Sequence, residues 1–136
     1  MNLRTQPTPT SCTQACLAMI IDAPVEDVLS VYPNPMGQFE FIKALTECDV
    51  LFNVISLGPL VFEGIYTCAV PSLNHPGTNH QLMLDVNFDH EDGHALWVFD
   101  PNSGREGAKI YDSDGSNLKS WTELIRVREG GKLPTQ

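Results

Sequence analysis

The sequence contains no apolar run long enough to cross a membrane. Its longest hydrophobic stretches, residues 15–21 and 54–62, are ended or interrupted by proline, glycine or charge well short of the ~20 residues that a spanning helix needs. Residues 1–10 also lack the basic segment followed by an apolar stretch that marks a secretory signal. We therefore expect a protein that has no membrane partner and lies in the cytoplasm.

Basic residues are also scarce. Eight lysines and arginines stand against 17 acidic residues, which gives a net charge of -9. Such a charge repels phosphate backbones and anionic lipid headgroups. Nucleic acid is therefore not an expected partner, but an acidic surface leaves open an inhibitor or interaction protein that engages a basic partner.

Cysteines are few and are not arranged in CxxC pairs. The four at positions 12, 16, 48 and 68 lack the density of a secreted disulfide framework, so we expect reduced thiols. With 136 residues, 42% of them hydrophobic, the chain can form one core without disulfides or a structural metal. Since there is no repeat or linker, we predict a single domain over 1–136, with a disordered tail from about residue 130 to 136.

Three helices are predicted in the first part of the chain. Apolar residues recur there at helical spacing over residues 12–21, 24–32 and 37–48. Beyond them the sequence changes to β-branched and aromatic runs, which predict strands over 50–57, 65–71, 81–88 and 95–99. A further helix is predicted over 116–127, from the spacing of Leu118, Trp121 and Ile125. Helices followed by strands indicate an α+β fold.

Cys12 stands at a predicted helix N-terminus. Ser11 precedes it, and Gln14 follows Ser11 at the spacing of a capping box. A helix N-terminus lowers the pKa of a thiol, because the backbone dipole and the free amides favour a negative charge. Cys16 lies one turn further along, where this influence has faded, and is predicted to be a core residue. Cys12 is therefore the candidate nucleophile.

A nucleophilic thiol needs a base, and the base needs a partner that fixes its tautomer. His80 opens the hairpin predicted over 81–99 and Asp100 closes it, so the pairing of the two strands makes them neighbours. An acyl-transfer site also needs donors for the oxyanion, commonly the nucleophile's own N–H and a side-chain amide, for which Gln6 is the candidate. The predicted catalytic set is thus Cys12, His80, Asp100 and Gln6.

These residues stand in segments that resemble the motifs of a known family. The nucleophile region of papain-like cysteine peptidases is similar to residues 6–7, 11–12 and 15–19. The histidine and aspartate motifs of that family resemble residues 79–80, 97–102 and 104. Within the family, the chain is most similar to the small bacterial peptidases that clip double-glycine leaders in bacteriocin exporters. The resemblance runs from Gln6 to Gly104.

The resemblance implies a papain-like fold, in which N-terminal helices pack on an antiparallel β-sheet. It also implies roles: Cys12 as nucleophile, His80 as general base, Asp100 as the acid that orients the histidine, and Gln6 as the oxyanion-hole residue. The implied activity is that of a cysteine peptidase that cleaves an extended peptide or protein substrate and needs no cofactor. The substrate and the oligomeric state stay open.

One residue departs from the family pattern. The family places glycine directly after the cysteine, whereas this chain has Thr13, whose branched side chain could crowd a substrate. A catalytically silent binding module that keeps the fold and a peptide groove is therefore an alternative function. Transfer of the acyl group to an acceptor other than water is a second alternative, since the same apparatus serves both reactions.

Two metal sites are possible alternatives. Cys12 and Cys16 at i, i+4, with His75 and His80, have zinc-like spacing, but the two pairs lie further apart than in compact zinc modules. A calcium loop at Asp112, Asp114 and Asn117 lacks the required glutamate. His90 and His94 flank an acidic turn and are expected at the surface. We therefore predict no metal.

Overall fold

The computed structural model describes residues 1–55, 62–71, 79–88, 96–102, 107–112 and 122–134. Three helices come first: α1 (Cys12–Ile21), α2 (Val25–Val31) and α3 (Gln38–Glu47). Six strands follow: β1 (Phe52–Val54), β2 (Gly64–Pro71), β3 (Asn79–Val86), β4 (Leu96–Asp100), β5 (Lys109–Asp112) and β6 (Thr122–Val127). Within these residues, no helix combines the length and apolarity that a bilayer crossing requires.

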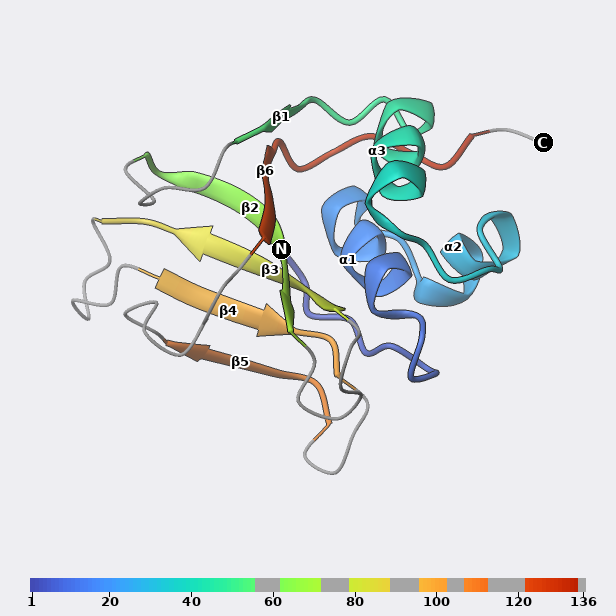
Figure 1. The fold of residues 1–136 in the computed structure, drawn as a ribbon, viewed down its shortest axis with the longest axis horizontal. Helices are drawn as coiled ribbons and strands as arrows, with labels where there is room; N and C mark the ends of the chain where they lie inside the picture. The colour runs from blue at the N-terminus through green and yellow to red at the C-terminus, as the bar shows by residue number, and fades with distance from the viewer. Residues whose placement is uncertain (56–61, 72–78, 89–95, 103–106, 113–121, 135–136) are drawn as a thin grey trace.

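The strands form one antiparallel sheet in the order β1-β6-β2-β3-β4-β5. The helices gather beside this sheet, with α1 between the sheet and the other two helices (Figure 1). The fold is therefore α+β, with N-terminal helices packed on an antiparallel sheet, and the three helices predicted from periodicity are confirmed within two residues at each end.

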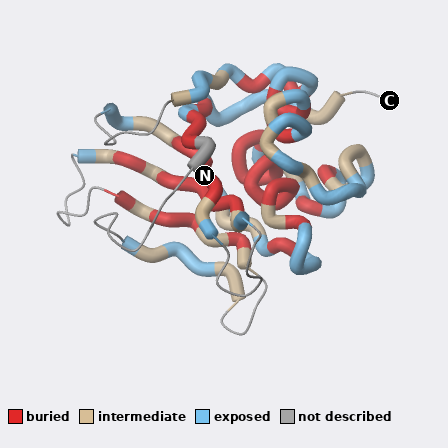
Figure 2. The backbone as a smooth tube through the Cα atoms, in the orientation of Figure 1, coloured by how far each residue is buried: buried red, intermediate tan, exposed pale blue. Residues whose placement is uncertain are grey.

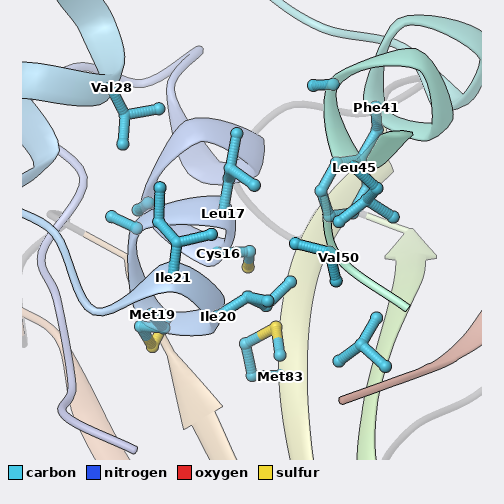
Figure 3. Packing of buried hydrophobic residues seen from close by; sticks show 14 of the residues in the cluster. Cys16, Leu17, Met19, Ile20, Ile21, Val28, Phe41, Leu45, Val50 and Met83 are labelled. Atoms are coloured by element: carbon cyan, nitrogen blue, oxygen red, sulfur yellow. The ribbon is translucent and has the colours of Figure 1, made fainter. Parts of the chain in front are cut away.

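Helix α1 is the centre of the molecule. All its residues except Cys12 are buried, and its tube is buried along nearly its whole length in Figure 2. A helix that is buried on every side lies inside a core, and the polar Thr13 and Gln14 of α1 are both hydrogen-bonded there. Here one side of α1 faces α2 and α3, and another faces the sheet at Met83 of β3 (Figure 3). This packing holds the start of α1 against the central strands.

Two apolar clusters cover the two faces of the sheet. Because successive side chains of a strand point to opposite faces, Met83 joins the helices while its neighbours Leu82 and Leu84 join a second cluster on the other face. The same alternation divides Phe99 from Val98 on β4. The central strands are thus packed on both faces, and this packing holds the ends of these strands in place.

The hairpin predicted over 81–99 is confirmed, since β3 and β4 pair antiparallel with Met83 opposite Phe99. The prediction of a helix over 116–127 is wrong at its C-terminal part, where Thr122–Val127 forms β6 between β1 and β2. Leu124 and Ile125 are both buried, one in each apolar cluster. Two successive buried apolar residues hide the alternation that distinguishes a strand from a helix. Residues 113–121 lie outside the described residues.

The C-terminal segment corrects the expectation of a tail disordered from residue 130. The Gly130 N–H donates to the Ile20 carbonyl at 2.9 Å, and the Lys132 N–H donates to the Cys48 carbonyl at 2.9 Å. Leu133 packs against the cluster around α1. Two hydrogen bonds and one apolar contact hold this segment on the ends of α1 and α3. Residues 135–136 lie outside the described residues.

Candidate active site

Cys12 is the first residue of α1, as its sequence position predicted. The predicted capping box is wrong: the Ser11 hydroxyl donates to the Thr8 carbonyl at 3.0 Å, and the Gln14 amide donates to the carbonyls of Tyr32 and Asn34. Ser11 has φ −109° and ψ 21°, outside the extended region from which a cap reaches the first turn. No side chain caps the helix, so its positive end stays available to the sulfur.

His80 and Asp100 are brought together by the β3–β4 pairing. Extending the register from Met83 opposite Phe99 places Asp100 diagonally across from His80 on the same face of the sheet. The two side chains meet, with His80 Nε2 2.7 Å from Asp100 Oδ1, and both are mostly buried. The Asn102 N–H also donates to Asp100 Oδ1 at 2.9 Å. The carboxylate is therefore fixed before it orients the imidazole.

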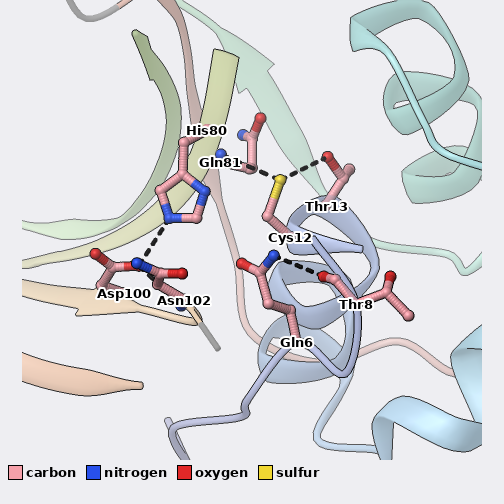
Figure 4. A network of polar contacts seen from close by, with 8 residues as sticks. All are labelled: Gln6, Thr8, Cys12, Thr13, His80, Gln81, Asp100 and Asn102. Atoms are coloured by element: carbon pink, nitrogen blue, oxygen red, sulfur yellow. Dashed lines mark hydrogen bonds and ion pairs between the residues drawn. The ribbon is translucent and has the colours of Figure 1, made fainter. Parts of the chain in front are cut away.

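The Cys12 sulfur lies on the opposite side of the imidazole from Asp100. Figure 4 shows the sulfur between the His80 ring and the Thr13 hydroxyl, with the second ring nitrogen, Nδ1, on the sulfur's side. The Gln81 backbone N–H donates to the sulfur at 3.5 Å. Asp100 holds Nε2 as the protonated nitrogen when the ring is neutral, because a carboxylate can only accept. Nδ1 is then the nitrogen that can take a proton from Cys12.

The environment favours a charged pair of sulfur and imidazole. Burial raises the pKa of the Cys12 thiol, but hydrogen bonds from His80 and the Gln81 N–H outweigh it, and the pKa lies below its ordinary value. Burial lowers the pKa of His80, but the hydrogen bonds and charges of Asp100 and Cys12 raise it to about 9. Below about pH 9 and above the thiol pKa, the site therefore holds a thiolate beside an imidazolium.

Asp100 stays ionised in this arrangement. Burial raises the pKa of its carboxyl group, but the hydrogen bond and charge of His80, with the Asn102 N–H, hold the pKa below its ordinary value. A buried carboxylate that keeps its charge stabilises the imidazolium through a short, charge-assisted hydrogen bond. The imidazole of His80 is therefore protonated at neutral pH.

Gln6 is buried beside this group, at 2% exposure. Its backbone N–H donates to the Pro101 carbonyl at 2.8 Å, which ties the N-terminal segment to the residue after Asp100. Its side-chain Nε2 donates to the Thr8 carbonyl at 2.8 Å. Because that carbonyl only accepts, the amide is fixed with nitrogen toward Thr8, and one of its two N–H groups remains for another acceptor. Figure 4 places this amide next to Cys12.

Thr13, the residue expected to crowd a substrate, lies beside the Cys12 sulfur. Its side chain is buried, and its hydroxyl donates to the Met36 carbonyl at 3.3 Å. The hydroxyl lies 4.0 Å from the Cys12 sulfur. Thr13 thus anchors the connection between α2 and α3 to the start of α1 and contributes to lowering the thiol pKa.

The arrangement can perform nucleophilic chemistry at a carbonyl carbon. It combines an activated sulfur, a base on one side of it, and free N–H donors at the helix start and on Gln6. No family model matches the sequence, and a search of curated proteins found no match. The functional interpretation therefore rests on these side chains and their geometry.

The other three thiols are not activated. Burial raises the pKa of Cys16 well above its ordinary value, raises that of Cys68 to about 12, and raises that of Cys48. Cys16 is fully buried in the core, as predicted. All four cysteines are free thiols, which agrees with the expectation of reduced cysteines.

Among the described residues, no cluster of three or more histidine, cysteine, aspartate or glutamate side chains could hold a metal. Of the metal alternatives, Cys16 points into the core and Asp112 ends β5. The other residues of those alternatives, His75, Asp114 and Asn117, lie outside the described residues, as do His90 and His94, which were expected at the surface.

The sequence reasoning missed Gln81, whose N–H contacts the sulfur, and Thr67, whose hydroxyl holds the Gln81 side chain. The Gln81 contact to Cys12 is made by a backbone N–H, and every residue except proline carries that group. No residue type could signal it. Thr67 appeared only as one residue of a β-rich run, and only the strand register places it beside Gln81.

A groove of about 590 Å³ lies elsewhere, between β1, β2 and β6. Its lining includes Gly64 and Ile65, which pair with the end of β3 that is opposite to His80. None of its lining residues belongs to the predicted catalytic set. The groove and the candidate active site are therefore separate features.

Proposed function

We propose that this protein is a cysteine peptidase of papain-like type, which cleaves extended peptide segments through an acyl-enzyme. The observation that carries the proposal is the His80–Asp100 contact of 2.7 Å beside a thiol whose pKa is lowered at a helix N-terminus. A structural histidine needs no activated thiol next to it, and perturbed pKa values of this kind gather at functional sites. The order of helices and strands supports the same reading.

The proposed reaction begins with the thiolate of Cys12. Its Sγ attacks the carbonyl carbon of the scissile amide, and the electron pair of the C=O bond moves to oxygen. The Cys12 N–H, which has no partner within the helix, and the free N–H of Gln6 Nε2 donate to this oxyanion. The imidazolium of His80 then gives its proton to the leaving nitrogen, and the C–N bond breaks to leave a thioester.

Hydrolysis of the thioester restores the site. His80, now neutral, takes a proton from water while the water oxygen attacks the thioester carbon. The C–S bond breaks, the acid product leaves, and Cys12 returns to thiolate beside a protonated His80. Asp100 stays ionised throughout and stabilises each imidazolium state. An amine acceptor in place of water would give acyl transfer by the same steps.

A peptide or protein substrate, and a cytoplasmic location, complete the proposal. Four free cysteines would persist in a reducing compartment, which supports that location. The net charge of -9 argues against nucleic acid as the partner.

The test is cleavage of a pool of unstructured peptides, read by mass spectrometry of both the products and the acid-quenched protein. We expect new peptide termini together with a mass increase on Cys12 that equals the acyl half of a cleaved peptide. Cys12→Ala should abolish both signals, whereas the matched control Cys48→Ala, at the end of α3, should keep them.

A folded protein that binds peptides equally well before and after the Cys12→Ala substitution, and never forms product or adduct, would contradict the proposal. That outcome would favour the binding module that Thr13 suggested. Products that carry an added amine in place of a new carboxylate would favour acyl transfer. Cleavage that survives Cys12→Ala would show that another group is the nucleophile.

A further inference from the structure

A buried, hydrogen-bonded hydroxyl lies beneath the candidate active site. Thr67 of β2 is fully buried, and its Oγ1 donates to the Leu82 carbonyl at 2.9 Å. The same oxygen accepts from Gln81 Nε2 at 2.6 Å. A hydroxyl has one hydrogen to donate and two lone pairs to accept with. The hydrogen is used by Leu82, so Gln81 must present its NH₂ group and not its oxygen.

Cys16 is buried in the core one turn after Cys12, and burial raises the pKa of its thiol well above the ordinary value. Cys12 and Cys16 lie on one face of α1, one turn apart. Thr67 and Gln81 are diagonal neighbours on one face of the sheet, since Ala69 pairs with Gln81. The Gln81 N–H contacts the Cys12 sulfur, so the first turn of α1 lies against this part of the sheet.

Gln81 links the buried hydroxyl to the reacting atom. Its side chain is held by Thr67, and its backbone N–H donates to the Cys12 sulfur at 3.5 Å. We infer that Thr67 and Gln81 are positioning residues for the thiolate of Cys12: the buried hydroxyl fixes the Gln81 side chain and thereby directs the Gln81 N–H at the sulfur. The inference rests on the proposed function in that the thiolate is taken to be the nucleophile.

The physical reason is that a hydrogen bond to a charged acceptor depends strongly on alignment. A backbone N–H cannot rotate independently of its strand, so its direction is set by whatever holds the residue. His80 immediately precedes Gln81, so the same contact also fixes the strand segment that carries the base. One buried network therefore aligns two groups, the Gln81 N–H that donates to the thiolate and the imidazole of His80.

The test uses the rate of Cys12 alkylation by iodoacetamide as a function of pH, which needs no peptide turnover. Thr67→Val keeps the shape and removes the hydroxyl, and Gln81→Met keeps the length and removes the amide. Each should lower the rate by about tenfold at a pH below the thiol pKa, because one charge-assisted donor is misdirected. The rates should converge with wild type at high pH, where every thiol is ionised.

Three controls separate positioning from general damage. Thr67→Ser keeps the hydroxyl and should restore the wild-type profile. Thr46→Val removes a hydroxyl that bonds only within α3, and should leave the profile unchanged. In the wild-type protein, the NMR amide signal of Gln81 should shift as Cys12 ionises, and this shift should vanish in Cys12→Ala. Even when the variants at Thr67 and Gln81 do not fold, a Gln81 signal that does not follow Cys12 ionisation overturns the inference.

The inference would be overturned if folded Thr67→Val and Gln81→Met gave the same pH profile of Cys12 alkylation as the wild type. It would also be overturned if the Gln81 amide signal did not follow the ionisation of the thiol. Either result would leave peptide cleavage by the wild type untouched. Conversely, the variants could change the alkylation profile as expected while the wild type cleaves no peptide. That result would remove the proposed function and keep the positioning network.

Discussion

Replacing Asp100 with asparagine removes one charge and almost nothing else. The amide oxygen of the new side chain could still accept from His80 Nε2 and from the Asn102 N–H, the two donors that contact Asp100 Oδ1. What is lost is the negative charge that, with Cys12, raises the pKa of His80 to about 9. Burial would then dominate and lower the pKa of the imidazole.

The magnitude follows from the loss of an opposite charge at contact distance. Such a charge shifts a pKa by roughly 1–3 units, which corresponds to about 1–4 kcal/mol of differential stabilisation. A fall of about two units from a pKa of about 9 would reduce the protonated fraction of His80 at pH 8 about tenfold. Since the proposed first step needs the imidazolium, activity at that pH should fall in proportion.

The assay combines an NMR titration of the His80 ring with the pH profile of kcat/KM. In the wild type, the rate should rise as Cys12 ionises and fall as His80 loses its proton near pH 9. In Asp100→Asn, the alkaline limb should move to lower pH by the same amount as the ring titration. Asp85→Asn, on the same strand as His80, changes the net charge equally and is the matched control.

An unchanged His80 titration in Asp100→Asn would refute the reasoning, because the contact at 2.7 Å would then carry no charge coupling. A ring titration that moves while the alkaline limb stays would refute the assignment of that limb to His80.

The remaining predictions concern the thiols, the amide and the C-terminal segment. Iodoacetamide should label Cys12 well ahead of the three thiols whose pKa is raised; equal labelling, read by peptide mapping, would contradict activation. Gln6→Ala should lower kcat by roughly 100-fold, as for loss of an oxyanion donor, without changing the alkylation rate of Cys12; a parallel loss of both would indicate a structural role. Gly131→Ala should lower the urea-measured free energy of unfolding by about 1–3 kcal/mol, because Gly131 has φ +83° and a Cβ there would meet the Cys48 carbonyl; an unchanged value would mean that the segment is not held on the core.

The elements that the sequence predicted well are those whose signals are local. Helix α1 follows from an apolar run that begins after Ser11, and the β3–β4 hairpin follows from two strand patterns with a polar connection between them. The predicted hairpin was enough to predict that His80 lies beside Asp100, because antiparallel pairing places the start of one strand next to the end of the other. The helix predicted over 116–127 is wrong at residues 122–127, because the successive apolar residues Leu124 and Ile125 are both buried and hide the alternation of a half-buried strand.

By itself, the sequence determined the residue types of the site and the position of Cys12 at a helix start, since both depend on short-range order along the chain. Only the tertiary structure decided which groups meet. Ser11 and Gln14 have the spacing of a cap, yet the Ser11 hydroxyl oxygen accepts from the Thr8 N–H, and the Gln14 amide donates to carbonyls outside α1. The donor that reaches the Cys12 sulfur is a backbone N–H of Gln81, and backbone groups are alike at nearly every position, so only three-dimensional packing can select one of them.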